Sequence, residues 1–431
     1  MNSLADELNT VLDAAVAGRL LSNLGRRFYF PKGIIAQSTE AKRSAHLANG
    51  TIGMALQNGQ PLILSAISDN MPLLTPEQAV IYAPTAGVEQ AREAWKKLII
   101  RKNPSTDPAK ISLPTVVPGL TAGLSYTADI FFDEKDVLIV SDPCWDNYAL
   151  IYNIRRGTQI REIPFFGKGP GLDLDSIGNA IREQAKTGKV RILFNFPNNP
   201  SGYSPTREEE DALVEIVRKT AEGGADVLVI CDDAYFGLFY EDNVSKESLF
   251  GRFAILHDRV LAVKIDGPIK EDYIWGLRLG FVTYGSLGLD AAQYDALTRK
   301  LMGAIRSSVS CANTPGQYIM LKAMEDSRTH GEKARFWNIL KRRYDKVKAF
   351  IQAHPDHPVL KPLPFNSGYF MCFRCEGISA EALRQELLLK QGVGAISFGD
   401  RYLRIAFAGI DEEKIDEVYR VIYETAAEMG R

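Results

Sequence analysis

The chain has 431 residues, of which 45% are apolar and 24% are charged, and its formal net charge is −2. This composition is typical of a globular protein long enough for two domains, and the charge excludes a general polyanion-binding surface. No apolar run reaches the length of a membrane span, so we expect no membrane partner. The first residues, 1–7, include acids and no apolar core segment, so we expect no secretory signal.

The cysteines are few and odd in number, which favours a reducing cytoplasm over a disulfide framework. They are Cys144, Cys231, Cys311, Cys372 and Cys375. Cys372 and Cys375 match a C-x-x-C pattern, but we expect a strand over 369–374. Positions i and i+3 of a strand point to opposite faces, so we interpret the pair as structural. The five histidines are scattered, and no metal-ligand spacing is present.

The N-terminal part predicts several short elements. Leucines and other apolar residues at helical spacing predict a helix over 3–25, followed by a loop around 31–33. A helix is expected over 40–49 and an irregular segment over 54–75. A turn-rich loop at 82–87 then leads into a helix over 88–101.

Helices and apolar strands alternate from there to about residue 325. We expect helices over 121–131, 174–187, 206–222, 288–305 and 315–325. We expect strands over 137–141, 190–195, 227–231, 261–265 and 281–284. Near-continuous apolar strands separated by helices indicate a mainly parallel sheet buried on both faces. The sequence from Thr206 to Glu209 is a capping box, which fixes the start of one helix.

The pattern changes at about residue 330. A long charged helix is expected over 329–353, then strands over 369–374, 394–398 and 402–407 and helices over 379–391 and 411–429. This α+β pattern predicts a second, smaller domain.

The segment from Asp266 to Gly280 is the first candidate site. A turn at Gly267-Pro268 presents Lys270 at the carboxyl end of a predicted strand, where α/β proteins build their sites. A nucleophilic lysine needs burial or a nearby cation to lower its pKa, and Arg278 supplies a cation that also grips anions. Taken alone, the segment is equally consistent with a charged surface turn.

Polar residues also follow the two preceding strands. Asn199 lies in the Pro-rich loop 195–202 and offers an amide, although an ordinary strand-to-helix turn is the more common explanation of such a loop taken alone. Asp232 ends the next strand, where a carboxylate is costly without a cationic partner. Tyr235 follows three residues later with a phenol. A solvated strand end is the alternative for both.

Two further segments complete the set. Gly119, Leu120 and Thr121 begin a helix whose free N–H groups can bind a phosphate. Trp145 follows another strand and can stack on a flat ligand, although tryptophan is more often core. Pyridoxal 5′-phosphate requires such a set of groups. The set consists of a lysine, a carboxylate, a phenol, an amide, an aromatic face, an arginine and an anion cup.

The order and spacing of these motifs match a family. Asn-Pro-Ser-Gly (199–202), then Asp232-x-x-Tyr235, then Lys270 with Arg278 eight residues later resemble the fold-type-I pyridoxal-phosphate enzymes, closest to the class I/II aminotransferases that include aspartate aminotransferase. The resemblance implies a large α/β domain over 60–329, with a mainly parallel sheet sandwiched by helices. It also implies a smaller α+β domain built from 1–59 and 330–431.

The resemblance also assigns roles around the cofactor. Lys270 is similar to the Schiff-base lysine and proton shuttle, and Lys264 lacks the eight-residue spacing to Arg278. Asp232 would pair with the pyridine nitrogen. The other implied contacts are those of Tyr235 and Asn199 to the ring oxygen, Trp145 to the ring face, and Arg278, Gly119, Leu120 and Thr121 to the phosphate.

Further roles concern the substrate and a second subunit. Arg404 matches the arginine that binds the substrate α-carboxylate, and Gly53 matches the small residue beside the substrate. Tyr82 matches a tyrosine that reaches the neighbouring subunit's cofactor, which implies a homodimer. Arg306 can be aligned with an arginine that reads acidic side chains, or it is a solvated helix end. Ser310 falls near the partner's phosphate in the family.

Two positions depart from the family pattern. Gly267 and Pro118 stand where serines are common, so the phosphate cup has fewer hydroxyl donors, for which Thr121 would have to compensate.

The resemblance implies an amino acid aminotransferase with a ping-pong mechanism. The donor would be an acidic or aromatic L-amino acid and the acceptor a 2-oxo acid such as 2-oxoglutarate. A C–S lyase or another β-eliminating enzyme on the same scaffold is the alternative. A non-catalytic regulator is disfavoured, because only about 50 residues precede the first motif and no nucleic-acid partner is indicated.

Overall fold

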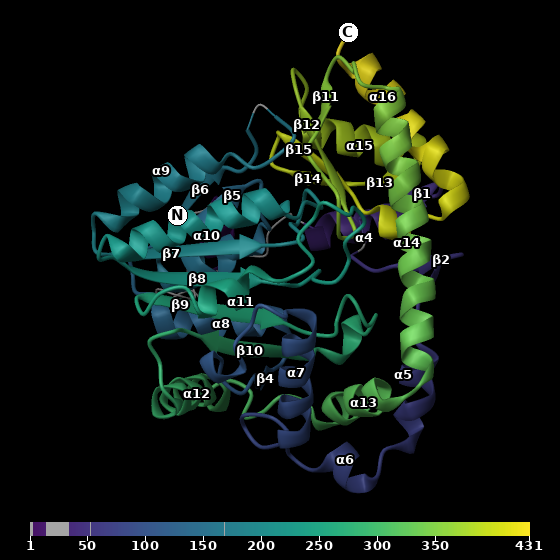
Figure 1. Cartoon of the computed structure of the whole chain (residues 1–431). Coiled ribbons are helices and arrows are strands. Elements are labelled where there is room, and N and C mark those ends of the chain that lie inside the picture. Colours follow the sequence, from purple (N-terminus) through teal and green to yellow (C-terminus); the bar gives the residue numbers. More distant parts are fainter. Residues whose placement is uncertain (1–2, 14–33, 52, 168) are drawn as a thin grey trace.

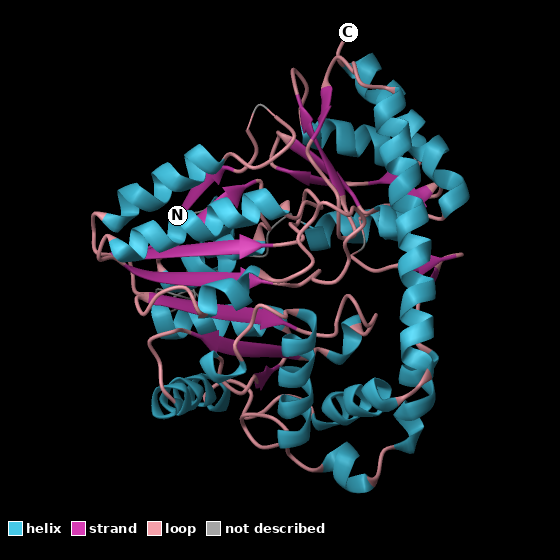
Figure 2. Cartoon of the chain, in the orientation of Figure 1, coloured by secondary structure: helices cyan, strands magenta, loops and turns pink. Residues whose placement is uncertain are grey.

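A computed structural model describes residues 3–13, 34–51, 53–167 and 169–431 of the chain. Two sheets dominate this part of the structure, and a long helix runs beside both of them (Figures 1 and 2). No helix in the described ranges combines the length and the apolar character needed to cross a membrane.

The larger sheet has seven strands, and all of them except β10 run parallel. In spatial order they are β4 (Thr115–Val117), β10 (Gly280–Gly285), β9 (Val260–Asp266), β8 (Asp226–Asp232), β7 (Lys189–Asn195), β5 (Val137–Asp142) and β6 (Gln159–Pro164). The mainly parallel sheet is therefore confirmed. Strand β6 was not predicted, because it lies at the sheet edge and carries polar residues.

Helices cover both faces of this sheet, which explains its continuous apolar strands. Val229 packs with one face and the next residue, Ile230, packs with the other. One face is covered by α7 (Glu89–Lys102), α9 (Leu174–Ala185), α10 (Arg207–Glu222) and α11 (Leu249–Ala254). The other is covered by α8 (Leu120–Phe131), the π-helix η3 (Ala149–Ile154) and α12 (Ala291–Arg306).

The smaller sheet is antiparallel, in the order β11 (Leu360–Pro362), β12 (Met371–Cys375), β15 (Tyr402–Ile405) and β14 (Ile396–Phe398). It is accompanied by α15 (Ala380–Gln391) and α16 (Ile415–Met429). Cys372 and Cys375 are both buried and pack in different clusters, as expected for opposite faces. No cluster of metal-ligating side chains occurs among the described residues.

Helix α14 (Arg328–Ala353) follows α13 (Thr314–Glu325) and extends from the larger sheet's helices to the smaller sheet (Figure 1). Its later turns pack against α16. Short 3₁₀ turns lie between the longer elements: η2 (Pro108–Lys110), η4 (Trp275–Leu277), η5 (Phe407–Gly409) and η6 (Glu412–Lys414). The capping box of α10 is confirmed, because Thr206 Oγ1 accepts from Glu209 N–H at 3.3 Å and Glu209 Oε2 accepts from Thr206 N–H at 2.9 Å.

The N-terminal predictions need correction. Helix α1 (Ser3–Asp13) agrees with the start of the helix expected over 3–25, while 14–25 and the loop at 31–33 lie outside the described residues. Helix α4 is Ile34–Ser44, and the end of the helix expected over 40–49 is wrong. Residues 48–49 instead form β1, parallel to β13 (Val393–Gly394), because their backbone pairs with a strand more than 340 residues away.

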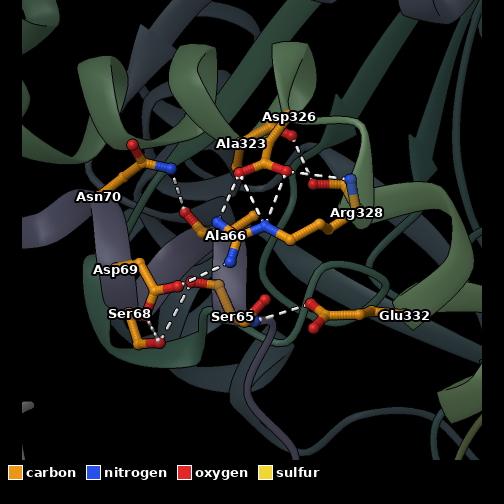
Figure 3. A network of polar contacts seen from close by, with 10 residues as sticks. Ser65, Ala66, Ser68, Asp69, Asn70, Ala323, Asp326, Arg328 and Glu332 are labelled. Carbon is orange, nitrogen blue, oxygen red and sulfur yellow. Dashed lines mark hydrogen bonds and ion pairs between the residues drawn. The ribbon is translucent and has the colours of Figure 1, made fainter.

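The segment 54–75 is not irregular. It contains the hairpin β2 (Leu56–Gln57) and β3 (Gln60–Pro61), the helix α5 (Ser65–Asn70) and the turn η1 (Met71–Leu73), and α6 (Pro76–Val80) follows. Helix α5 is held from a distance: Glu332 Oε2 accepts from the Ser65 N–H at 2.7 Å, and Arg328 pairs with Asp69 at 2.7 Å (Figure 3). A cap supplied by α14 leaves no local signal at residue 65.

Gly202 joins the loop after β7 to the smaller sheet. Its φ is +79°, its carbonyl accepts from Ser367 N–H at 2.8 Å, and a Cβ built on it would lie 2.0 Å from the Phe370 carbonyl oxygen. Any side chain here would push the two segments apart.

We therefore expect Gly202→Ala to lower the free energy of unfolding by at least about 2 kcal/mol more than Gly188→Ala. Gly188 is the matched control, because its φ is +82° and a Cβ there would meet nothing within 4 Å. Denaturant titration of both variants measures the difference. An equal decrease in the free energy of unfolding in the two variants would mean that backbone strain alone, and not the contact with Phe370, explains the effect at Gly202.

Candidate active site

The carboxyl ends of three neighbouring strands bring the predicted residues together. Asn195 ends β7, Asp232 ends β8, and Lys270 follows β9 after a turn. The Asn195 amide donates to the Asp232 carbonyl at 2.8 Å, and its Oδ1 accepts from the Asn199 N–H at 2.7 Å. The end of β7 therefore fixes both the Asn199 loop and the end of β8.

Lys270 is enclosed by groups that disfavour its charge. Its Nζ donates to the Gly53 carbonyl at 2.8 Å and lies 5.1 Å from the centre of the Tyr235 ring. Burial, with the positive charges of Arg404 and Arg278, lowers the pKa of Lys270 to about 7. A large fraction of this amine is therefore neutral, and nucleophilic, at neutral pH.

Lys264 is a structural residue. It is buried, forms an ion pair with Asp233, and lies 3.5 Å from the carboxylate of Asp266. Its neighbouring carboxylates raise its pKa despite burial, so it stays charged. This geometry agrees with the choice of Lys270 over Lys264.

Asp232 has one satisfied and one unsatisfied oxygen. Its Oδ2 accepts from the Tyr148 hydroxyl at 2.6 Å, whereas its Oδ1 is buried without a partner in the described structure. Burial raises the pKa of Asp232 to about 6, and the Tyr148 bond opposes that rise. The backbone N–H of Ala234 also lowers the pKa of this carboxyl group, but Oδ1 itself has no hydrogen bond to a described residue. A buried carboxylate oxygen in this state fits the protonated ring nitrogen of pyridoxal phosphate.

No role was predicted for Tyr148 from the sequence. Its ring packs edge-to-face against Trp145 at 5.4 Å, so both aromatic residues of the segment 142–148 belong to the site. The available signal was the spacing of three residues, which brings Tyr148 back beside Trp145 where the chain enters η3.

Arg404 reaches the same region from β15 of the smaller sheet. It is buried, and it donates to Asn199 Oδ1 at 2.8 Å and to the Thr51 carbonyl at 3.1 Å. Its Nε is buried without a partner in the described ranges. Both bonds go to neutral oxygens, so this guanidinium is suited to a carboxylate ligand.

Aromatic rings surround this arginine and the lysine. The guanidinium carbon of Arg404 lies 4.2 Å from the ring centre of Phe370 and 5.6 Å from that of Phe398. Phe370 packs edge-to-face on Tyr235, whose phenol stays protonated because burial raises its pKa. A Cβ on Gly53 would lie 3.2 Å from Lys270 Nζ, so a larger residue at position 53 would crowd the amine.

The residues predicted to bind an anion also lie together in the structure. Gly119 caps α8 with a φ of +91°, and a Cβ there would lie 2.8 Å from an Arg278 Nη. The guanidinium of Arg278 therefore lies at the start of α8, beside Leu120 and Thr121, where free N–H groups favour an anion.

The departure at Gly267 has a steric cause. A Cβ at this position would lie 2.7 Å from the Leu279 carbonyl and 3.0 Å from the Leu120 side chain. No serine fits there without a shift of the backbone, so the hydroxyl common in the family is excluded by packing. Pro118 precedes Gly119 and has no N–H to offer.

Two predicted residues are exposed and a third is half-buried. Tyr82 is 86% exposed, Arg306 is exposed at the end of α12, and the half-buried Ser310 follows with a φ of +69°. The structure does not bring them into the site formed by Lys270 and Arg404. Exposed Leu73, Val80 and Ile81 lie close to Tyr82 in the sequence.

The Tyr148 bond can be tested on the protein without ligand. Tyr148→Phe should raise the Asp232 pKa above about 6 by roughly one unit, because a hydrogen bond to a charged group contributes about 1.5–3 kcal/mol. Infrared titration of the carboxyl band, assigned with Asp232→Asn, measures the shift. Tyr152→Phe is the control, since the buried Tyr152 hydroxyl has no partner in the described structure. An unchanged titration in Tyr148→Phe would contradict this account.

Comparisons with known proteins agree with this geometry. The model of the family "Aminotransferase class I and II" matches residues 52–422. The probable aspartate/prephenate aminotransferase of Aquifex aeolicus is 25% identical over 358 residues, which is 79% of this chain and 82% of that protein. Aspartate aminotransferase of Escherichia coli is 25% identical over 253 residues, 58% of this chain and 61% of that protein.

Solved structures share the fold. An aminotransferase from Anaerococcus prevotii superposes with a TM-score of 0.82 at 24% identity, covering 94% of this chain and 98% of that one. Kynurenine aminotransferase from Pyrococcus horikoshii, in complex with PMP, gives a TM-score of 0.80 at 18% identity, covering 96% and 99%. The chain belongs to the class I and II aminotransferases, which are pyridoxal-phosphate-dependent enzymes of fold type I.

Proposed function

We propose that the protein transfers the amino group of an L-amino acid to a 2-oxo acid in two half-reactions, with an acidic or aromatic donor and 2-oxoglutarate as the default acceptor. One observation carries this proposal. The Lys270 amine and the buried guanidinium of Arg404, which forms no salt bridge within the described residues, bond to the same short segment, at the carbonyls of Gly53 and Thr51. Together they suit the amino and carboxylate ends of one substrate.

The cofactor site follows from the polar groups around Lys270. Bound pyridoxal phosphate supplies an aldehyde that condenses with amines and a ring that withdraws electrons from the substrate. The Oδ1 of Asp232 would accept a hydrogen bond from the protonated ring nitrogen, and Tyr148 would hold this carboxylate in place. Other side chains would serve the ring oxygen (Tyr235, Asn199), the ring face (Trp145) and the phosphate (Arg278, Gly119, Leu120, Thr121).

Lys270 would act twice. As a neutral amine it would hold the cofactor through its aldehyde, and once the substrate amine has taken that place it would accept the proton from the substrate α-carbon. A pKa of about 7 suits both tasks, because the amine then gains and loses a proton at little cost near neutral pH. The ring centres of Tyr235 and Tyr369 lie 5.1 and 6.0 Å from this nitrogen, so aromatic surface faces it.

Arg404 would bind the substrate α-carboxylate through its planar fork. Asn199 already holds one end of the guanidinium at 2.8 Å, so the fork is oriented before substrate binds. Gly53 leaves room beside Lys270 for the substrate.

A homodimer would complete the site. The exposed side chains of Leu73, Val80, Ile81 and Tyr82 are apolar or aromatic, as expected of a surface that another subunit covers. In such a dimer Tyr82 and Ser310 would approach the partner's cofactor, and Arg306 would read an acidic substrate side chain. The division into domains at 1–59, 60–329 and 330–431, and a cytoplasmic location, remain predictions.

A half-reaction screen tests the proposal. Each common amino acid is mixed with the enzyme without an acceptor, and the visible absorbance of the lysine-bound cofactor is followed. Conversion to the amino form of the cofactor would establish transamination and identify the donor. Release of pyruvate and ammonia instead would support the β-eliminating alternative. Lys270→Ala should lack the starting absorbance.

The same assay tests Arg404. We expect Arg404→Lys to raise the KM for every amino acid roughly 10–100-fold, because a point charge replaces a bidentate grip. Arg374→Lys is a suitable control, since Arg374 lies exposed on the neighbouring strand β12 and pairs with Glu376 at 2.5 Å. An unchanged KM in Arg404→Lys would refute the carboxylate role.

A further inference from the structure

Two carboxylates follow Lys270 directly in the sequence, at Glu271 and Asp272. A carboxylate close to a lysine stabilises the charged ammonium and raises the lysine pKa. An enzyme that needs Lys270 as a neutral amine must therefore keep these two charges from acting on it. The structure shows where they go.

Both carboxylates turn toward lysines from other elements. Lys102, the last residue of α7, forms an ion pair with Glu271, and Lys333, in the second turn of α14, lies 3.2 Å from Glu271 and also pairs with Asp272. The side chains are only partly exposed, 24% for Lys102, 20% for Glu271, 16% for Asp272 and 25% for Lys333. We call these four residues the lysine-loop clamp; their formal charges sum to zero.

Backbone geometry supports the clamp. Gly237 has a φ of +96°, and a Cβ on it would lie 2.7 Å from the Glu271 carboxyl carbon. The bare backbone after Tyr235 thus makes room for the Glu271 carboxylate. Lys102 and Lys333 lower the pKa of Glu271 although burial opposes them, so this carboxylate is ionised.

The surroundings of Lys270 differ from those of the clamp. Charges acting on Lys270 are the cations Arg404 and Arg278, and the side chains facing it are the neutral phenols Tyr235 and Tyr369. The clamp instead borders a cavity of about 760 Å³. Other titratable groups on the cavity wall are Arg101, Tyr273, Glu325, Asp326 and His330. The buried Asp266 also lies close enough for the charge of Lys102 to oppose the rise that burial causes in its pKa.

We propose that the lysine-loop clamp consists of positioning residues, which fix the loop of Lys270 against α7 and α14 and neutralise its two carboxylates so that Lys270 remains an uncharged nucleophile. This inference rests on the proposed role of Lys270. Helix α14 is itself anchored at this end by Glu332 and Arg328, which bond to α5 (Figure 3). Lys333 therefore approaches the loop of Lys270 from a helix that is bonded to α5 at the same end.

The proposal predicts shifts of opposite sign. Lys333→Met leaves the clamp with a net negative charge, which should raise the midpoint of Lys270 nitrogen protonation by roughly 0.5–1 pH unit. Glu271→Gln leaves a net positive charge and should lower it by a similar amount. The double variant should return close to the wild-type midpoint, and Lys333→Arg should not shift it.

The measurement is a pH titration of the visible absorbance of the lysine-bound cofactor in each holoenzyme, which reports protonation at the Lys270 nitrogen without any turnover. Lys341→Met is the matched control: Lys341 lies on the same helix and pairs with Asp345 at 2.6 Å, four residues along. Its midpoint should equal that of the wild type.

Shifts of the same sign in Lys333→Met and Glu271→Gln, or no shift in either, would overturn the proposal. If Lys333→Met does not fold, Glu271→Gln and Asp272→Asn decide, since both must lower the midpoint. A wild-type protein without the absorbance of a lysine-bound cofactor would overturn the proposed function of Lys270 instead, so the two failures are distinguishable.

Discussion

The candidate site depends on keeping one amine buried with no described carboxylate paired to it. Lys270 donates to a backbone carbonyl and lies near the Tyr235 ring. Burial and the positive charges of Arg404 and Arg278 lower its pKa to about 7. Burying a lysine in this way works against folding, because the charged form loses its hydration. Aromatic rings packed around the amine, and the backbone at Gly53 and at the end of β9, offset this free-energy cost of burial. The reactivity of the site and its instability have the same origin.

The two sheets contribute different halves of the chemistry. The parallel sheet places Asp232 and Lys270 at the carboxyl ends of adjacent strands, whereas the antiparallel sheet supplies Arg404. Asn199 connects the halves, because its amide oxygen accepts from Arg404 while its loop is tied to β7. Gly202 then joins that loop to the smaller sheet without space for a side chain. A substrate bound to Arg404 and Lys270 would therefore span the boundary between the two sheets.

Much of this was predictable from the sequence, because buried parallel strands and the turns after them leave strong local signals. Strands β5, β7, β8 and β9, the cap at Thr206 and the placement of Lys270, Asp232 and Asn199 follow from such signals. Features created by distant partners were not predictable. Helix α5 takes its cap from Glu332, β1 pairs with β13, and Tyr148 matters only because folding brings it to Asp232. The structure of one chain does not bring Tyr82, Arg306 or Ser310 to Lys270, so the roles expected of them from the resemblance stay predictions.

Folding shifts Lys270 toward its neutral form, and proton linkage measures this shift directly. With a pKa of about 7 when folded and about 10.4 when unfolded, Lys270 binds fewer protons in the folded state between these values, so its burial destabilises the cofactor-free protein most below pH 7 and least near pH 10. The free energy of unfolding should accordingly be higher for Lys270→Met than for wild type at pH 6–7, and this gain should disappear toward pH 10. A difference independent of pH would contradict the account.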